Sequence, residues 1–482
     1  MEKVRIGLIA ANRGFFSDEL AAKMRGETIK AMKAAGMEVV VPDEKMTNAG
    51  TVGTYQEALK CAKLFRDKAV HGIIVAAVNF GDEQSVAVTV SETGVDVPIL
   101  IYGCQEEETL TMKTPRRDSF CGLISIGDAL RQINAKYTVA RTPICFPSEK
   151  SFSEELARFA AVCRVVNGVV GARYGQVGMR PNDFWTCRYS EAALQSQLGI
   201  NTITKDLSEA VLAVQKLSDS DPAVKKIVKD IAAGADASAA PKDALVKMAK
   251  FEVVLKRFAE EFDLDALAIQ CWTSLQDSLG FCSCGVMGRL GDQDLPCACE
   301  SDVMGALSMH ALRLASGNAA GLADWNNVHN EDPDLVNIWH CGVFPPSLAK
   351  TKPKINVHGI IAETTGPENA WGVCEFIMKD GPITIARVTQ DNDANFQALV
   401  VPAKFEANKA KTFGAYAWAR IDDLTPLYRD VICRYFPHHT AFTSGDAADA
   451  IWEAFGNYLD FEVFGPKQTV PGMWTQVPPF RG

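Results

Sequence analysis

The chain has 482 residues, 47% hydrophobic and 22% charged, which is typical of a globular protein with two to four domains. A net charge of −10 and a pI near 5.4 argue against a surface that binds nucleic acid or an anionic membrane, because phosphate binding needs clustered Lys and Arg. The start, MEKVRIGLIAANRGFF, has an apolar run too short to span a membrane and no signal-peptide cleavage pattern, which predicts a cytoplasmic protein.

Strands and helices alternate through the first part of the chain. The predicted strands cover residues 4–10, 37–41, 72–77 and 97–102, and the helices between them include residues 19–35 and 55–68. This alternation predicts a doubly wound parallel sheet in an N-terminal α/β domain, residues 1–164. No GxGxxG or Walker pattern is present, so a nucleotide cofactor is not indicated.

Polar residues follow two of these strands. Arg13 lies in the loop after the first strand, and Asn79 and Asp82 follow the third. In doubly wound sheets ligands bind at the carboxyl ends of strands, so these side chains are candidates to face a cleft. The alternative is that they are ordinary solvated loop residues.

A second α/β pattern occupies the middle of the chain, and short strands follow it. We assign residues 165–345 to a central α/β domain, with strands at 176–179, 201–204 and 266–272 and helices at 208–217, 222–232 and 241–262. Residues 346–482 carry closely spaced strands at 355–358, 381–388, 393–402 and 412–420. The predicted fold is therefore two doubly wound parallel-sheet domains followed by a small antiparallel β-barrel domain.

Two acids lie at the ends of a helix and strand in the central domain. Ser301 can cap a helix with apolar residues at three- and four-residue steps, which Gly317 ends. Glu300 thus precedes a helix N-terminus, where the macrodipole favours an ionised carboxylate. A short apolar run then predicts a buried strand that ends at Asp324. Two such carboxylates are typical of a site, although each could merely cap a local turn.

Cysteines could organise this region instead. Cys282, Cys284, Cys297 and Cys299 form two CxC pairs among the fourteen cysteines of the chain. Zinc ribbons usually use CxxC spacing, so the pattern favours buried thiols over a structural zinc site, which remains an alternative.

Imidazoles accompany the acids later in the chain. Of the seven histidines, His340 lies in WHCG, and His438 and His439 lie in FPHHTAF. Carboxylates combined with imidazoles suit Mn²⁺, Fe²⁺, Co²⁺ or Zn²⁺, and oxygen-rich sets favour Mn²⁺.

The ordered motifs PCACESDVMGALSMHAL, ADWNN, NIWHCG and FPHHTAF resemble the L-fucose isomerase and L-arabinose isomerase superfamily. The resemblance implies a metal-dependent aldose–ketose isomerase, commonly with Mn²⁺, that forms a homo-oligomer (hexamer, trimer or dimer). It implies catalytic, metal-binding roles for Glu300 and Asp324 and a ligand role for His439 or its neighbour His438. His340 resembles a further ligand of the arabinose-isomerase branch.

The residue types suit this chemistry. A metal that binds O1 and O2 of a sugar acidifies the C2 proton, and a carboxylate can carry that proton to C1 through a cis-enediol. Gln270, Trp272, Asn327 and His340 are candidates to bind the sugar, although Trp272 could equally pack in the core.

The identity of the sugar stays open. Arg13, Arg116, Arg117 and Arg180 would allow an anionic sugar such as sulfoquinovose if they converge on the site, whereas surface arginines are the simpler interpretation. A further alternative is a non-catalytic sugar-binding protein, since such proteins also pair two doubly wound domains. It would bind sugar without metal and exchange no C2 proton.

Overall fold

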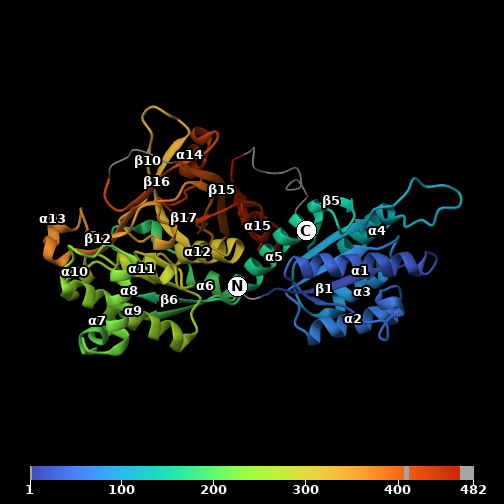
Figure 1. The fold of residues 1–482 in the computed structure, drawn as a ribbon, viewed down its shortest axis with the longest axis horizontal. Helices are drawn as coiled ribbons and strands as arrows, with labels where there is room; N and C mark the ends of the chain where they lie inside the picture. Colours follow the sequence, from blue (N-terminus) through green and yellow to red (C-terminus); the bar gives the residue numbers. More distant parts are fainter. Residues whose placement is uncertain (1–2, 407–411, 467–482) are drawn as a thin grey trace. The chain divides into compact units, whose positions relative to one another are not determined.

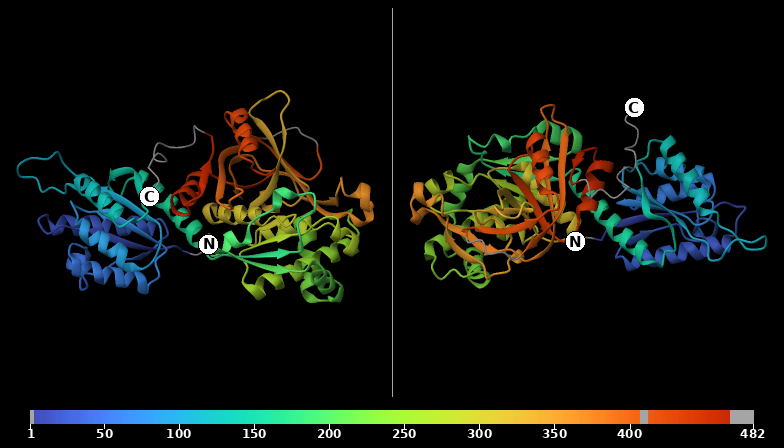
Figure 2. Two further views of the ribbon diagram at one scale, coloured as in Figure 1. Left: turned by 180° about the vertical axis from the view of Figure 1, so that it is seen from behind. Right: turned by 90° about the horizontal axis from the view of Figure 1, so that it is seen from above.

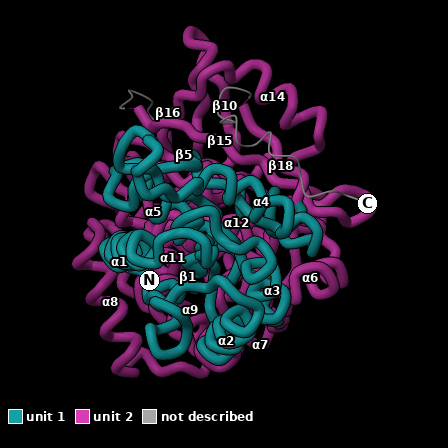
Figure 3. Tube along the Cα trace, turned by 90° about the vertical axis from the view of Figure 1, so that its right-hand side faces the viewer, with its two compact units in different colours: residues 1–167, 453–460, 471–482 teal, residues 168–452, 461–470 magenta. Residues whose placement is uncertain are grey.

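The structure, a computed structural model, describes residues 3–406 and 412–466, and these fall into two compact units (Figures 1 and 3). Among the described residues, unit 1 holds 3–167 and 453–460, and unit 2 holds 168–452 and 461–466. Within these ranges, every helix is too short or too polar to traverse a bilayer.

Unit 1 is a parallel sheet with helices on both faces. Its strand order is β2-β1-β3-β4-β5. The strands are β1 (Arg5–Ala11), β2 (Glu38–Val40), β3 (Gly72–Ala77), β4 (Ile99–Cys104) and β5 (Thr138–Cys145). The helices are α1 (Asp18–Ala34), α2 (Tyr55–Asp67), α3 (Glu83–Thr93), α4 (Ser119–Gln132) and α5 (Lys150–Val169). Buried residues of α1 and α5 pack on one face, and those of α2, α3 and α4 pack on the other, so the doubly wound prediction is confirmed.

Unit 2 begins with a second parallel sheet, in the order β7-β6-β8-β9. Its strands are β6 (Arg173–Val177), β7 (Asn201–Lys205), β8 (Ala266–Ile269) and β9 (Cys297–Cys299). The helices of this part are α6 (Glu191–Leu198), α7 (Leu207–Lys216), α8 (Pro222–Gly234), α9 (Lys242–Phe262), α10 (Ser274–Leu279), α11 (Cys284–Gly291) and α12 (Val303–Ser316). All described pairings within this sheet are parallel.

The later strands of unit 2 form one sheet, drawn from yellow to red in Figure 2, and six of them close into a ring. The strands are β10 (Ala320–Val328), β11 (Leu335–His340), β12 (Lys354–Val357), β13 (Trp371–Ile377), β14 (Gly381–Gln390), β15 (Phe396–Glu406), β16 (Ala415–Arg420), β17 (His439–Ser444) and β18 (Glu462–Phe464). Because β16 pairs with both β11 and β15, the order β16-β11-β10-β17-β14-β15 returns to β16. Neighbours in this ring are antiparallel, which confirms the predicted barrel. Three short helices accompany these strands: α13 (Ala362–Thr365), α14 (Leu424–Cys433) and α15 (Ala448–Glu453).

Two local predictions near the acids need correction. Asp302, not Ser301, caps α12: its side chain accepts a hydrogen bond from the Gly305 backbone N–H. Ser301 cannot do so because it adopts a left-handed conformation, with φ 53°. The strand predicted to end at Asp324 continues to Val328, so Asp324 lies inside β10 and caps no turn.

Candidate functional site

A tight turn places Glu300 at the carboxyl edge of the second parallel sheet. Glu300 directly follows β9, and both Glu300 and Ser301 have positive φ values, 60° and 53°. The Ser301 backbone N–H donates to the Ile269 carbonyl at the end of β8, which fixes the turn to the sheet. Such left-handed residues cost conformational energy outside glycine, and they are frequent at functional sites.

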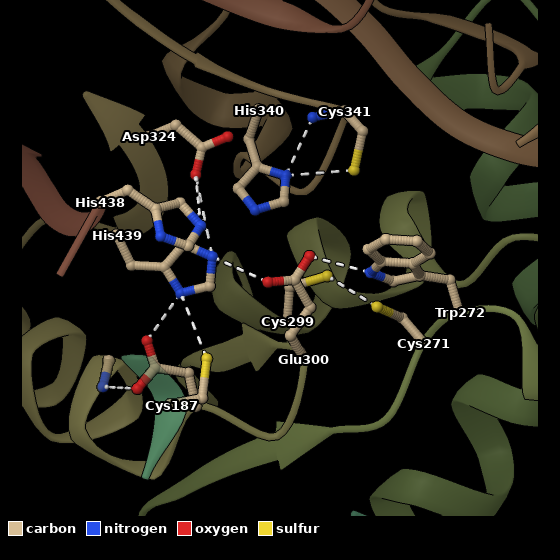
Figure 4. Close-up of polar contacts among 12 residues, drawn as sticks. Cys187, Cys271, Trp272, Cys299, Glu300, Asp324, His340, Cys341, His438 and His439 are labelled. Atoms are coloured by element: carbon tan, nitrogen blue, oxygen red, sulfur yellow. Dashed lines mark hydrogen bonds and ion pairs between the residues drawn. The ribbon is translucent and has the colours of Figure 1, made fainter. Parts of the chain in front are cut away.

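Two barrel strands bring an acid and an imidazole to the same place. Asp324 of β10 is paired in register with His439 of β17. Directly opposite residues of antiparallel strands place their side chains next to each other. His439 Nε2 lies 2.9 Å from Glu300 Oε2 and 3.7 Å from Asp324 Oδ1, so one ring nitrogen faces both acids (Figure 4).

The other ring nitrogen of His439, Nδ1, faces away from Glu300 and Asp324 and toward Asp302. His439 Nδ1 lies 2.8 Å from Oδ2 of Asp302, and an ionised carboxylate can only accept a hydrogen bond, so Nδ1 carries the proton. Burial alone would lower the pKa of His439, but the carboxylates of Asp302 and Glu300 outweigh it and raise that pKa well above its ordinary value.

His438 is a weaker partner for the acids than His439. Its Nε2 lies 4.0 Å from Asp324 Oδ1, and 42% of its side chain is exposed, whereas the side chain of His439 is 1% exposed. Burial lowers the pKa of His438. Of the two neighbours, His439 therefore has the geometry of a ligand that shares a cation with both acids.

His340, the last residue of β11, presents its imidazole to the same region (Figure 4). Its Nδ1 accepts the Cys341 backbone N–H over 2.9 Å. An imidazole whose Nδ1 accepts a hydrogen bond carries its proton on Nε2. This buried Nε2 has no hydrogen-bond partner among residues 3–406 and 412–466.

Aromatic rings form one wall beside these groups. Trp272 donates its Nε1–H to Glu300 Oε1 over 3.0 Å. Phe184, in the loop that follows β6, packs edge-on against Trp272 and His438, with centroid distances of 5.3 and 5.7 Å. The loop between β6 and α6 therefore lies beside the acids and imidazoles.

The donor atoms at this site fit a divalent cation. Glu300 Oε2 and Asp324 Oδ1 are buried, and neither makes a well-formed hydrogen bond within the described part of the chain. Candidate ligand atoms of Asp324, His438 and His439 all lie within 4.8 Å of one another. Unsatisfied buried carboxylate oxygens are costly, and a cation with mixed oxygen and nitrogen ligands would satisfy them. Burial also raises the pKa of Asp324, although the imidazoles of His340 and His439 oppose this.

The other predicted sugar-binding residues occupy different positions. Both polar groups of the Gln270 side chain have partners: Oε1 accepts from the Met179 backbone N–H, and Nε2 donates to Ser274 Oγ. Asn327 is exposed on β10 beyond a bulge and bonds Asn326. Both roles in sugar binding remain predictions.

Arg13 belongs to unit 1 and is paired there. It forms an ion pair with Glu83, donates Nε–H to the Gly81 carbonyl over 2.7 Å, and stacks on Phe80. Asp82 caps α3 by accepting the Ser85 backbone N–H. A role for Arg13 in binding the substrate remains a prediction.

The four cysteines of the CxC pairs do not form one ligand set in the described structure. Cys284 Sγ lies 3.6 Å from Cys341 Sγ, and Cys299 Sγ lies 3.1 Å from Cys271 Sγ. Cys282 and Cys297 are buried as free thiols. The zinc alternative based on these four residues therefore lacks a common site.

Sequence reasoning missed three residues of this region. Asp302 stands two positions after Glu300 in the ESD motif, and that motif was the available signal. Arg387, on β14, binds Asp302 through both guanidinium NH groups, and no local pattern indicates it. Phe184 lies in an irregular loop without a motif.

Known proteins resemble the chain along most of its length. A family profile described as "Fucose/sulfoquinovose isomerase, N-terminal domain" matches residues 7–170, and one described as "L-fucose isomerase, C-terminal domain" matches residues 338–465. Proteins named sulfoquinovose isomerase from Priestia megaterium and Priestia aryabhattai are each 27% identical over 480 residues, covering 96% of this chain and 99% of the relative. One from Alkalicoccus urumqiensis is 28% identical over 346 residues, covering 69% of this chain and 73% of the relative.

Proposed function

The chain belongs to the fucose/sulfoquinovose isomerase family, and we propose that it uses Glu300, Asp324, His439 and a divalent cation to interconvert sulfoquinovose and its 2-ketose. By its family it is an aldose–ketose isomerase, which favours an enzyme over a non-catalytic sugar-binding protein. The observation that carries the proposal is that His439 Nε2 lies 2.9 Å from Glu300 Oε2 and 3.7 Å from Asp324 Oδ1, two buried carboxylate oxygens.

The choice of sulfoquinovose follows the relatives. The relatives that align with 96% of the chain carry the name sulfoquinovose isomerase, and the N-terminal profile names this sugar together with fucose. L-Fucose, which the C-terminal profile names, is the neutral alternative.

The cation would be held by Glu300, Asp324 and His439, a set of oxygen and nitrogen donors that suits Mn²⁺. When bound, it would supply Lewis-acid polarisation of the sugar oxygens O1 and O2. The same donors also accept Fe²⁺, Co²⁺ and Zn²⁺, so Mn²⁺ is the cation to load first.

The two acids would move the protons. Isomerisation transfers the C2 proton to C1 and the O2 hydroxyl proton to O1 through a cis-enediol, so no atom is gained or lost. One carboxylate of the pair Glu300 and Asp324 takes the C2 proton and returns it to C1. Because the Trp272 indole holds Glu300 Oε1, the orientation of that carboxylate is fixed before the sugar binds.

His340 would bind the sugar rather than the cation. Its Nδ1 accepts a backbone N–H, so its free Nε2 carries a proton and is a donor. A metal ligand needs a lone pair at that atom. A hydrogen bond from Nε2 to a sugar oxygen would satisfy a buried donor that lacks a partner within the described ranges.

Arg180 is our candidate for the residue that binds the sulfonate. Of the four arginines considered, Arg13, Arg116 and Arg117 are each paired with a carboxylate. Arg180 instead donates to the carbonyls of Pro181 and Asn182, so its charge is not neutralised by these contacts. It lies in the same loop as Phe184, whose ring packs against Trp272 and His438. Arginine is well suited to bind a sulfonate through charge-assisted hydrogen bonds.

The test uses the full chain stripped with EDTA, reloaded with Mn²⁺ and incubated in D₂O with sulfoquinovose or L-fucose. NMR should detect the ketose of sulfoquinovose and deuterium at the exchanged carbon. Glu300→Gln and Asp324→Asn should abolish both signals. Isomerisation that survives complete removal of metal would overturn the role of the cation.

The substrate has its own control. Arg180→Met should lower kcat/KM for sulfoquinovose by about 10- to 100-fold, since a hydrogen bond to a charged group contributes about 1.5–3 kcal/mol. Arg188→Met is the matched variant in the same loop, where the guanidinium stacks on Trp185, and it should change kcat/KM little. Preference of the wild type for L-fucose would refute the sulfonated substrate and leave the isomerase reaction standing.

A further inference from the structure

Asp302 connects the cap of α12 to the imidazole that faces the two acids. The residue is fully buried. Its Oδ1 accepts the Gly305 backbone N–H over 2.8 Å, and its Oδ2 lies 2.8 Å from His439 Nδ1. The capping role therefore uses one oxygen, and the contact with the imidazole uses the other.

Arg387 holds both oxygens of this carboxylate. Its NH1 group donates to Oδ2 over 2.5 Å, and its NH2 group donates to Oδ1 over 3.0 Å. Arg387 is 1% exposed, and its guanidinium connects β14 to Asp302 at the start of α12. This bidentate contact fixes the plane of the Asp302 carboxylate as well as its position.

The charges explain why Asp302 remains an acceptor. The guanidinium of Arg387 donates to both oxygens of Asp302, and the Gly305 N–H donates to one of them, so three donors favour the ionised carboxylate. An ionised Asp302 requires the proton of His439 on Nδ1. Nε2, which faces Glu300 Oε2 and Asp324 Oδ1, is then the nitrogen that can offer a lone pair to a cation bound beside these acids.

We propose that Asp302 and Arg387 are positioning residues that fix the tautomer and ring orientation of His439 for the cation shared with Glu300 and Asp324. The inference rests on the proposed function, because it assumes a cation at these three side chains. Carboxylates that accept from the second nitrogen of a ligating imidazole commonly change metal affinity about 10- to 100-fold when they are removed.

Asp302→Asn separates the two roles of the residue. The amide oxygen can still accept the Gly305 N–H and cap α12, while the amide NH₂ meets the Nδ1–H of His439 as a second donor. The imidazole is then driven to the other tautomer, with its proton on Nε2 between the acids. We expect the Kd for Mn²⁺, measured by electron paramagnetic resonance of the free ion, to rise about 10- to 100-fold.

A second variant separates an effect on metal binding from a general loss of stability. Asp302→Asn leaves the buried charge of Arg387 without its partner, which destabilises the chain by itself. Asp302→Asn/Arg387→Met removes that charge as well and should recover the melting temperature. If Asp302 acts through His439, the double variant still binds Mn²⁺ about 10- to 100-fold more weakly than the wild type.

The outcomes are distinct. Wild-type Mn²⁺ affinity in either the single or the double variant would overturn the inference, because Asp302 would then serve only the helix or Arg387. Asp206→Asn, which changes the exposed cap of α7, should leave the Kd unchanged and controls for the loss of a capping charge. If the wild type binds no Mn²⁺, or if Glu300→Gln binds it normally, the proposed function fails irrespective of Asp302.

Discussion

Trp272 donates its indole Nε1–H to Oε1 of Glu300 across 3.0 Å. The second oxygen of the same carboxylate, Oε2, faces His439 at 2.9 Å. The two oxygens of Glu300 therefore have different tasks: one is held by the aromatic wall, and the other is directed at the proposed cation. This division can be tested by removing a single N–H group.

Trp272→Phe keeps an aromatic ring against Phe184 but removes the donor to Glu300. We expect kcat/KM to fall about tenfold, since a hydrogen bond to a charged group contributes about 1.5 kcal/mol at the low end of its range. The Kd for Mn²⁺ should change little, because Oε2 is untouched. Steady-state kinetics and metal titration measure the two effects separately.

A matched control is available in Trp185→Phe, where the tryptophan is exposed and stacks on Arg188. It should alter neither quantity. An increase in the Kd for Mn²⁺ as large as the loss of kcat/KM in Trp272→Phe would mean that Oε1, not Oε2, holds the cation.

Gly305→Ala should weaken metal binding although alanine normally stabilises a helix. A Cβ at this position would lie 2.7 Å from Asp302 Oδ2 and 2.8 Å from Leu322 Cδ1. Asp302 cannot move aside cheaply because Arg387 and His439 hold it. We expect a higher Kd for Mn²⁺ and a lower melting temperature, measured by metal titration and calorimetry.

Gly26→Ala provides the comparison, since a Cβ on Gly26 of α1 would meet nothing within 4 Å. That variant should gain about 0.5–1 kcal/mol of stability. Equal gains in both variants would show that the space beside Asp302 is larger than the structure indicates.

His310 makes the stability of the protein depend on pH. Burial, assisted by the charge of Arg313, lowers the pKa of His310 to about 4, whereas its ordinary value is 6.5. Because the folded pKa is depressed, the unfolded chain binds the proton first as pH falls. The stability that neutral His310 supplies is full above pH 6.5 and is lost between pH 6.5 and about 4. A difference of about 2.5 in pKa corresponds to about 3 kcal/mol.

His310→Gln removes this titration. At pH 7 the variant should be less stable than the wild type, because the imidazole packs on Tyr174 and contacts its hydroxyl at 3.2 Å. The difference between their urea midpoints should narrow as pH falls from 7 to 5. Midpoints that stay parallel over this range would show that His310 is not neutral in the fold.

Metal content distinguishes the acids from the thiols. Cys282→Ser should leave the amount of bound Mn²⁺ unchanged, because Cys282 contributes to none of the candidate ligand groups that the described residues form. Glu300→Gln should lose the ion. Elemental analysis of the dialysed proteins measures both. Zinc that is retained by the wild type and lost in Cys282→Ser would instead support a structural zinc site formed by cysteines.

Local signals predicted the helix at the centre of the site well. Apolar residues at three- and four-residue steps and the terminal Gly317 gave α12 nearly its observed bounds. The cap was assigned to the wrong residue because Ser301 and Asp302 are both good caps, and only the backbone conformation of the turn distinguishes them. The residue types of the turn do not determine that backbone conformation.

Long-range relationships were less accessible. Short alternating strands indicated a barrel, but the double pairing of β16 that closes it depends on register between distant segments. The same register sets Asp324 opposite His439, and the resemblance, rather than any pattern, suggested that pair. Arg387 stands in an ordinary strand, and only the folded chain explains why a buried guanidinium is there.

The separation of Asp302 and His439 along the chain has a consequence for biosynthesis. The two residues are 137 positions apart, and His439 opens β17 near the end of the described barrel. Glu300 and Asp324 are therefore synthesised long before His439. Until β17 has been synthesised and has paired with β10, the nascent chain lacks the imidazole of the proposed ligand set. We therefore expect the proposed cation to bind only after almost the whole protein has been translated.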